Sequence, residues 1–272
     1  MSHMQSFTAP TTTDRNNPLA VMQRYELKYL LSAAQAEALR RRIAGRMEPD
    51  QFGRTTIASL YYDTPDRRLV RASLEKPEFK EKLRARSYGP ATADSPVFLE
   101  LKRKARGIVY KRRVRCTLPA AEAFLAGAPA SDADSQIGRE LAAFRDRYGA
   151  LEPACLILYD RTAYFEPGGD LRLTIDENPR YRFSGAALTD FGGSKSLLPP
   201  GGAVLELKVQ GAMPLWLART LSEEQIRKTS FSKYGEACLR EYARPAPNLK
   251  ERTTATCLNP YILRPSPLPS FS

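Results

Sequence analysis

The sequence predicts an α+β fold, in which eight antiparallel strands close into a β-barrel, or tunnel, with a charged interior and flanking α-helices. Three observations lead to this prediction. Segments such as 204–209 (VLELKV) alternate charged and apolar residues with the two-residue period of a strand. Most such segments follow one another closely enough to pair as antiparallel neighbours. About eight of them occur, and eight antiparallel strands close into a barrel with room for one ligand.

The N-terminal half supplies five of these strands. We expect, in chain order, strand 22–31, helix 33–46, strand 54–62, helix 69–73 and strands 78–88, 96–104 and 108–117. Ser32 is a good N-cap for the first helix. The turn at 63–66 (DTPD) ends the second strand, and Arg106-Gly107 predicts a hairpin between the last two strands.

The C-terminal half supplies the other three strands. We expect helices 120–126 and 135–148, strands 154–165 and 171–175, a loop over 184–202, strand 203–209 and helices 214–221 and 233–242. These elements form a single domain over 21–243. A flexible segment with a tag-removal scar (1–20) is expected before it, and a Pro-rich tail (244–272) after it.

Splitting each strand by parity gathers its charges on one face. The face includes Lys28, Lys80, Lys82, Arg84, Arg86, Lys102, Lys111, Arg113, Arg161, Arg172 and Lys208, while Glu81, Arg112 and Asp160 break the pattern. For any one strand, the alternative is an amphipathic sheet with this face in water. For the whole set, a solvent face would carry a large field of one sign. Turned inward, the same face forms a cationic tunnel, which is costly to form unless an anion or water fills it.

The net charge of +12 likewise suggests an anionic partner. A triphosphate or polyphosphate chain has the required density of negative charge along a line. Arginine grips phosphate oxygens in pairs and lysine adds point charges, so we expect Lys82, Arg113 and Lys208 to bind phosphate. Carboxylates stand among the cations at Glu26, Glu100 and Glu206. Oxygen ligands beside phosphate suit Mn²⁺ or Mg²⁺, so we expect these three residues to bind metal.

Several functions are excluded by residue types that are scarce. His3 is the only histidine, and none of the four cysteines is spaced as CxxC, which excludes a His/Cys zinc site and histidine-based catalytic triads. No apolar run approaches the ~18 residues of a membrane span. We therefore expect a cytoplasmic protein. We do not expect nucleic acid as its partner, because the cations lie on a concave face too narrow for a duplex.

Seven short segments carry a resemblance. They are 24–28 (RYELK), 60–65 (LYYDTP), 82–86 (KLRAR), 98–102 (FLELK), 159–162 (YDRT), 205–208 (LELK) and 231–234 (FSKY). Together, over roughly 22–242, they resemble the polyphosphate polymerase domain of the vacuolar transporter chaperone (VTC) complex. That domain belongs to the triphosphate tunnel metalloenzyme (CYTH-like) superfamily. The resemblance implies an eight-stranded tunnel that transfers the γ-phosphate of ATP, or of another nucleoside triphosphate, onto inorganic polyphosphate with Mn²⁺ or Mg²⁺.

The same resemblance implies roles for individual residues. The phosphate-binding residues would be Lys28, Arg84, Arg86, Lys102, Lys111, Arg161, Arg172, Ser232 and Lys233. Glu206 matches the metal-binding glutamate and Tyr159 a tyrosine that lines the tunnel. We expect catalysis from Lys28, Arg84, Arg86, Lys102, Arg161 and Glu206. Arg24 replaces the first glutamate of the Glu-x-Glu-x-Lys signature of the cyclase and thiamine-triphosphatase branch, which favours the VTC branch.

Three alternatives stay open at the level of sequence. The same tunnel can hydrolyse triphosphate or short polyphosphate with water as the acceptor, and pyrophosphate is a further expected partner. It can also bind polyphosphate or nucleotide without catalysis. Asp176 is either a second acid beside the metal or a turn residue before Asn178-Pro179.

Overall fold

The computed structural model describes residues 24–75, 77–106, 108–130 and 133–242. The predicted segment 1–20, the tail 244–272 and Gly107 of the predicted hairpin turn lie outside these residues. Among the residues described, no helix has both the length and the apolar character needed to cross a membrane.

The described residues form ten strands and six helices. The strands are β1 (Arg24–Leu31), β2 (Glu48–Asp63), β3 (Phe79–Tyr88), β4 (Pro96–Ala105), β5 (Ile108–Thr117), β6 (Glu152–Phe165), β7 (Arg172–Arg182), β8 (Lys195–Ser196), β9 (Ala203–Gln210) and β10 (Lys228–Thr229). The helices are α1 (Ala33–Ile43), α2 (Arg68–Glu75), α3 (Leu118–Leu125), α4 (Gln136–Tyr148), α5 (Leu215–Glu223) and α6 (Lys233–Tyr242). The eight long strands confirm the predicted set.

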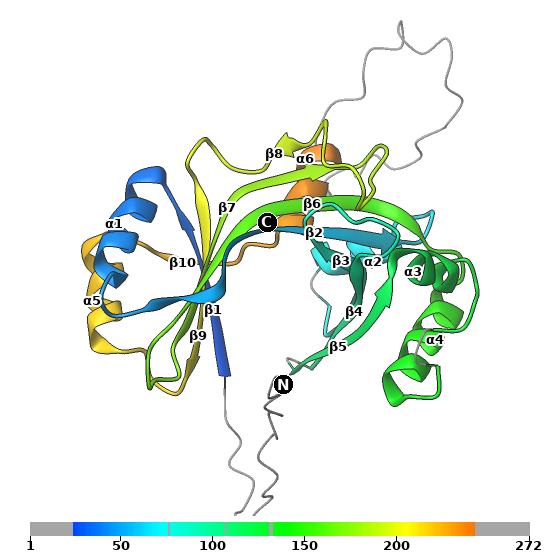
Figure 1. Cartoon of the computed structure of the whole chain (residues 1–272), viewed down its shortest axis with the longest axis horizontal. Helices are drawn as coiled ribbons and strands as arrows, with labels where there is room; N and C mark the ends of the chain where they lie inside the picture. Colours follow the sequence, from blue (N-terminus) through cyan, green and yellow to red (C-terminus); the bar gives the residue numbers. More distant parts are fainter. Residues whose placement is uncertain (1–23, 76, 107, 131–132, 243–272) are drawn as a thin grey trace, which may run out of the picture.

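All strands join one antiparallel sheet. Its order is β10-β1-β9-β7-β6-β2-β3-β4-β5, and β8 pairs with β7. Figure 1 shows this sheet as an arch, with β1 and β9 at one end and β4 and β5 at the other. The α+β class and the tunnel-like antiparallel sheet are thus as predicted.

The arch differs from a closed barrel at one place. In the described part of the chain, no backbone pairing joins β1 to β5, the long strands at the two ends of the order. A side-chain ion pair spans this gap instead, because Lys111 Nζ of β5 lies 3.6 Å from Glu26 Oε2 of β1. The concave face is therefore open along one seam, which the strand count alone did not predict.

Two apolar clusters hold helices against the convex face. In the first, Leu39 and Ile43 of α1 and Leu217 of α5 pack on Leu205 and Leu207 of β9. Burying each such side chain stabilises the fold by roughly 1.5–3 kcal/mol. Figure 1 shows α1 and α5 outside the β1–β9 end of the arch. The predicted N-cap also forms, since Ser32 Oγ accepts from the Gln35 amide and the Gln35 side chain accepts in return from the Ser32 amide.

The second cluster fixes the other wall. Phe124 of α3 and Leu141 and Phe144 of α4 pack on the strand leucines Leu83 and Leu101. Figure 1 places α3 and α4 outside the β4–β5 end. The helices that cover each end of the arch pack against apolar strand faces, so the opposite, charged faces of these strands point inward.

The helices α2 and α6 occupy a different position. Val70 of α2 and Tyr234 of α6 pack with Ile57, Cys155 and Ile157. These strand residues share their parity with Tyr159 and Arg161, whose side chains lie on the concave face. An apolar strip of the concave face is thus covered by α2 and α6. The charged strip beside it stays accessible, and the first residue of α6, Lys233, lies at the border.

Two strands run further than predicted. β2 begins at Glu48 rather than at 54, and a register shift near its start takes up the Pro49–Gly53 stretch. β7 continues to Arg182 past Asn178, whose φ of 47° accompanies a register shift against β6. Glycine and proline there mark irregularities within strands, not strand ends.

Candidate active site

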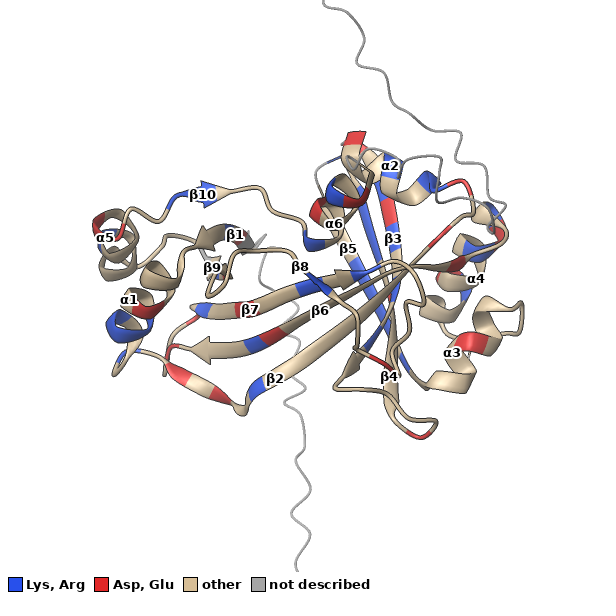
Figure 2. Cartoon of the chain, turned by 90° about the horizontal axis from the view of Figure 1, so that it is seen from above, with Lys and Arg blue, Asp and Glu red and all other residues tan. Residues whose placement is uncertain are grey.

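The concave face of the arch holds a cavity of about 860 Å³. The predicted site residues that line it are Glu26, Lys28, Lys82, Arg84, Arg86, Glu100, Lys102, Lys111, Arg113, Tyr159, Arg161, Glu206, Lys208, Ser232 and Lys233. In Figure 2, Lys and Arg colouring is dense along β3 and β5, which form one wall. The alternation of the strands therefore places these side chains around one space.

The first cluster surrounds Glu206 on β9. Lys28 of β1 is its cross-strand partner, and Lys28 Nζ lies 3.0 Å from Glu206 Oε1 and 3.6 Å from Glu26 Oε1. Arg161 Nη2 lies 3.4 Å from Glu206 Oε2. Burial opposes ionisation of Glu206, but the charges of Lys233, Lys28 and Arg161 outweigh it and lower its pKa. Glu206 is therefore ionised at neutral pH.

Asp176 of β7 belongs to the same cluster and is fully buried. It accepts hydrogen bonds from Arg161 Nε at 2.5 Å and Arg161 Nη2 at 2.7 Å, which is a bidentate pair. It also accepts from Lys233 Nζ at 2.5 Å. Asp176 also lies within β7, so it is not a turn residue. Its carboxylate fixes two of the predicted phosphate-binding cations.

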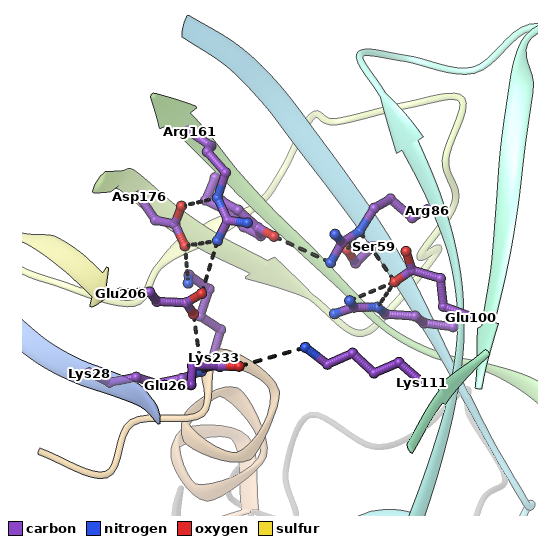
Figure 3. A network of polar contacts seen from close by, with 12 residues as sticks. Glu26, Lys28, Ser59, Arg86, Glu100, Lys111, Arg161, Asp176, Glu206 and Lys233 are labelled. Atoms are coloured by element: carbon purple, nitrogen blue, oxygen red, sulfur yellow. Dashed lines mark hydrogen bonds and ion pairs between the residues drawn. The ribbon is translucent and has the colours of Figure 1, made fainter. Parts of the chain in front are cut away.

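The second cluster surrounds Glu100 on β4. Arg84 Nε and Nη2 lie 2.7 and 2.6 Å from Glu100 Oε2, Arg113 donates to Oε1, and Arg86 Nε lies 3.7 Å from Oε2. Burial raises the pKa of Glu100, but Arg84, Arg86 and Arg113 outweigh it and lower the pKa to about 2. Figure 3 shows the two clusters facing each other, with Lys111 reaching Glu26 between them.

Aromatic hydroxyls position the arginines further. Arg84 Nη1 donates to the Tyr61 hydroxyl at 2.9 Å. Arg86, which is buried, donates to Ser59 Oγ at 3.3 Å and to the Tyr159 hydroxyl at 3.4 Å. The Tyr159 ring also lies 4.4 Å from Lys233 Nζ. The tyrosine predicted to line the tunnel thus contacts cations from two walls.

Other lysines carry charge that no carboxylate balances. Lys82, Lys102 and Lys208 have no ion pair with a carboxylate in the described part of the chain. Burial lowers the pKa of Lys82, and burial followed by the charge of Lys111 lowers the pKa of Lys102. An anion in the cavity removes this penalty, so these lysines favour an anionic ligand.

Glu81 and Arg112, which break the strand pattern, form ion pairs with residues of α4. Glu81 is buried and accepts from Arg103 Nε at 2.6 Å, Arg147 Nη1 at 2.9 Å and the Tyr148 hydroxyl at 3.0 Å. Arg112 Nε donates to Glu140 at 3.1 Å. These two polar side chains, which stand at positions expected to be apolar, therefore bind α4 to the strands. The alternation of the other residues in β3 and β5 is unaffected.

Arg172 does not line the main cavity. It lies in an adjoining cavity of about 450 Å³, which shares Glu206 and Lys208 with the main one. Its Nη1 donates to the carbonyl oxygens of Gly169 at 3.2 Å and Leu171 at 3.1 Å. Ser232 lies in the main cavity, and its Oγ accepts from the Gly235 amide at 3.2 Å in the first turn of α6.

The carboxylates predicted to bind metal fit that role unequally. Glu26 and Glu206 lie on adjacent strands and share Lys28, so they offer two hard oxygen donors beside the phosphate-binding cations. Mg²⁺ and Mn²⁺ at phosphate sites typically use one or two carboxylates together with phosphate oxygens. Glu100 is committed to three arginines on the opposite wall. In the residues described, no three acidic, histidine or cysteine side chains converge.

Three solved structures that are similar to this chain share little of its sequence. A proposed adenylate cyclase from Vibrio parahaemolyticus is 14% identical over 79% of this chain and 97% of its own, with a TM-score of 0.43. One from Bacillus halodurans is 14% identical over 76% and 92%, with a TM-score of 0.49. A Hippeastrum protein described as an adenylyl cyclase with dominant triphosphatase activity is 18% identical over 83% and 98%, with a TM-score of 0.50.

Comparison with curated proteins finds no match to this chain. The family model described as the VTC domain, in contrast, matches residues 23–242. The matched range begins just before β1 and ends with α6, so it includes every strand of the arch and every residue of both ion-pair clusters. The chain therefore belongs to the VTC domain family.

Proposed function

We propose that the protein is a metal-dependent polyphosphate polymerase, which transfers the γ-phosphate of ATP to a growing inorganic polyphosphate chain. One observation carries the proposal: fourteen lysines and arginines from both ends and the middle of the arch line one cavity, together with only three glutamates. Such a lining suits a linear ligand with many negative charges, such as a triphosphate joined to a polymer. The family of the chain supports the same substrate class.

In the proposed reaction, a terminal phosphate oxygen of the polymer attacks the γ-phosphorus of ATP. The bond from this phosphorus to the β,γ-bridging oxygen breaks, and ADP leaves with the electron pair. Arg84, Arg86 and Arg161 line the cavity, so they can donate to phosphate oxygens and stabilise the charge that shifts during transfer. Lys28, Lys102 and Lys233 add point charges along the chain.

Divalent metal has a defined place in this proposal. Glu26 and Glu206 would hold Mn²⁺ or Mg²⁺ together with phosphate oxygens, and the ion supplies neutralisation of charge on the transferring group. Lys28 now neutralises both carboxylates, and its ammonium is free to turn to phosphate when they are used by the ion. Asp176 keeps Arg161 and Lys233 oriented throughout, because it is fully buried.

Hydrolysis is the second candidate, in which water replaces the polymer as acceptor. The dominant triphosphatase activity ascribed to the Hippeastrum protein favours it, since the two chains share the tunnel fold. The two functions differ in the acceptor alone, and the same cations would serve both. A third candidate is a module that binds polyphosphate or nucleotide without turnover.

One incubation separates these candidates. Purified protein is mixed with ATP and Mn²⁺, and polymer, free phosphate and cyclic nucleotide are each assayed. We expect polymer, with ADP released in equal amount to the phosphate incorporated. Free phosphate without polymer would assign hydrolysis, and cyclic nucleotide would assign cyclase chemistry. Binding of tripolyphosphate with none of these products would assign a binding module.

We also propose a reducing, cytoplasmic location. Cys155 and Cys238 are buried free thiols, and Cys116 is a partly buried one. Nucleic acid is not proposed as a partner. Fourteen lysines and arginines line the cavity inside the arch, whereas Arg40 and Arg42 on the outer helix α1 are already paired with glutamates.

A further inference from the structure

The second cavity, of about 450 Å³, continues the main one along the concave face. Cross-strand pairing places Ala163, Thr174 and Glu206 in one row across β6, β7 and β9. The next row is Phe165, Arg172 and Lys208. Glu206 and Lys208 line both cavities, so a ligand whose phosphates lie in the main cavity can extend directly into the second. Its volume lies in the range of small-molecule sites.

The chemistry of this second cavity differs from that of the phosphate site. Its concave lining includes an aromatic ring, Phe165, with the guanidinium of Arg172 5.7 Å from the ring centroid. Two backbone carbonyls hold this guanidinium, and Arg172 has no ion pair with a carboxylate in the described part of the chain. Asp50, an acid, also lines the cavity.

A ring and a held guanidinium plane provide two flat faces for a planar partner. Bases stack on such faces whatever their identity, because every base has a π-face. The Asp50 carboxylate can accept from ribose hydroxyls or an exocyclic amine. A further phosphate would instead meet the carboxylate of Asp50, an acid that lines this cavity and not the main one.

We propose that this cavity is the nucleoside subsite, with Phe165 and Arg172 stacking on the base of a nucleoside triphosphate whose phosphates lie in the main cavity. The proposal rests on the proposed function, because it takes a triphosphate in the main cavity as given. It assigns Arg172 to the nucleoside, in place of the phosphate role expected from sequence. It also distinguishes ATP from inorganic tripolyphosphate, which has no group to place there.

The test compares these two ligands by titration calorimetry, with non-hydrolysable ATP analogue and tripolyphosphate as the probes. Phe165→Leu keeps an apolar side chain on β6 but removes the ring. We therefore expect this variant to bind the ATP analogue about 5- to 150-fold more weakly than wild type does. Tripolyphosphate affinity is expected to stay within about twofold. Phe165→Tyr restores the ring and should restore the wild-type affinity for the analogue.

Phe79→Leu is the matched control, because Phe79 is also a strand phenylalanine with a guanidinium near its ring, that of Arg147 at 5.9 Å, and lies outside both cavities. It should change neither affinity. If Phe165→Leu loses affinity equally for both ligands, or for neither, the nucleoside subsite is wrong. Arg172→Ala must likewise reduce the affinity for the analogue more than the affinity for tripolyphosphate. An equal reduction in the two affinities would show that Arg172 binds phosphate.

The two proposals fail in different ways. If wild-type protein binds tripolyphosphate tightly and Phe165→Leu binds the analogue as wild type does, only the nucleoside subsite is wrong. If wild-type protein binds neither tripolyphosphate nor the analogue, the proposed function is wrong, and the subsite loses its ligand with it.

Discussion

At the scale of single residues, the carboxylates inside the arch are each held by several cations from different elements. Glu206 contacts Lys28 of β1 and Arg161 of β6, and Asp176 contacts Arg161 and Lys233 of α6. Because each of these acids is paired with two cations, they fix the geometry of the cations before any ligand arrives. Replacing an acid and replacing a cation are therefore expected to have different effects, the first on turnover and the second on the affinity for phosphate.

Replacing Glu206 by Gln should abolish turnover while the fold is kept. Glutamine has nearly the same shape and can still accept from Lys28 and Arg161, but it lacks the charge that metal requires. We expect a loss of at least about 100-fold in kcat, measured as ADP release, with a far-UV circular dichroism melt close to wild type. Glu37→Gln, on the outer helix α1, is the control. Full activity of Glu206→Gln would show that the metal assignment is wrong.

Replacing Arg84 by Ala should weaken tripolyphosphate binding by about 1.5–3 kcal/mol, the contribution of a hydrogen bond to a charged group. Arg84 lines the cavity and donates to both Glu100 and Tyr61, so its guanidinium is positioned before binding. Calorimetry measures the change. Arg219→Ala, an exposed arginine on α5, should bind as wild type does. Unchanged affinity in Arg84→Ala would contradict the inward orientation of the β3 cations.

Much of this lining could be predicted from sequence, because strand parity decides which side a residue faces. Parity could not show which cations are neutralised. Asp176 precedes an Asn-Pro pair, which leaves its place in a strand or a turn undecided from sequence, and β7 continues past it. Phe165 gave no local signal, since an aromatic residue at the end of a strand usually belongs to the core. Its place beside Arg172 depends on pairing across β6 and β7.

At the scale of elements, the wall formed by β3, β4 and β5 is joined by one carboxylate. Glu100 of β4 is opposite Arg84 of β3 and Arg113 of β5 in the strand register, and it contacts both. The cross-strand ion pairs therefore hold three strands that lie at one end of the sheet, where no further strand pairs with β5 in the described residues.

This wall should lose stability in acid through Glu100. Its pKa is about 2 in the folded protein, below the ordinary value of 4.5, so its contribution is present above pH 4.5 and is lost as the pH falls towards 2. The full contribution is roughly 3 kcal/mol. Urea unfolding of wild type and Glu100→Gln should therefore differ most near pH 6 and converge towards pH 2. A constant difference across this range would contradict the assignment, and Asp94→Asn serves as an exposed control.

Strand identity followed from sequence, whereas strand ends did not. All eight long strands were predicted from alternation, but β8 and β10 are two residues long and too short to show any period. The start of β2 and the end of β7 differ from the prediction because proline and glycine there accompany register shifts that the neighbouring strand tolerates. Such tolerance depends on sheet partners, which lie far away in the chain.

At the scale of the whole molecule, the sequence carries a net charge of +12, and fourteen of its lysines and arginines line the inner face of the arch. The strand count predicted a closed barrel. The sheet instead leaves β1 and β5 unpaired in the described region, and the exposed ion pair between Lys111 and Glu26 spans the seam. Closure depends on the accumulated twist and curvature of every strand, so no single segment contains the information.

A ligand that fills this face should stabilise the whole fold. At 100 times its Kd, tripolyphosphate contributes about 2.7 kcal/mol, which raises Tm by roughly 5–11 °C for a domain of this size. Differential scanning calorimetry measures the shift. Tripolyphosphate should raise the Tm of Arg161→Ala by less than that of wild type. About 1 M NaCl should reduce the increase in Tm by screening the charges. Duplex DNA at the same phosphate concentration should give little change. An equal shift with DNA would place the anion site on the outer surface.

The paired carboxylates of the inner face have a consequence for selectivity. Glu26, Glu100 and Glu206 behave as counter-ions attached to the polypeptide, so anion binding there is an exchange reaction. A small anion such as chloride can replace only one tethered charge and gains little by doing so. A condensed phosphate chain replaces several in one event. Discrimination between anions thus depends on charge per unit length, much as a resin retains polyvalent ions from a salt solution.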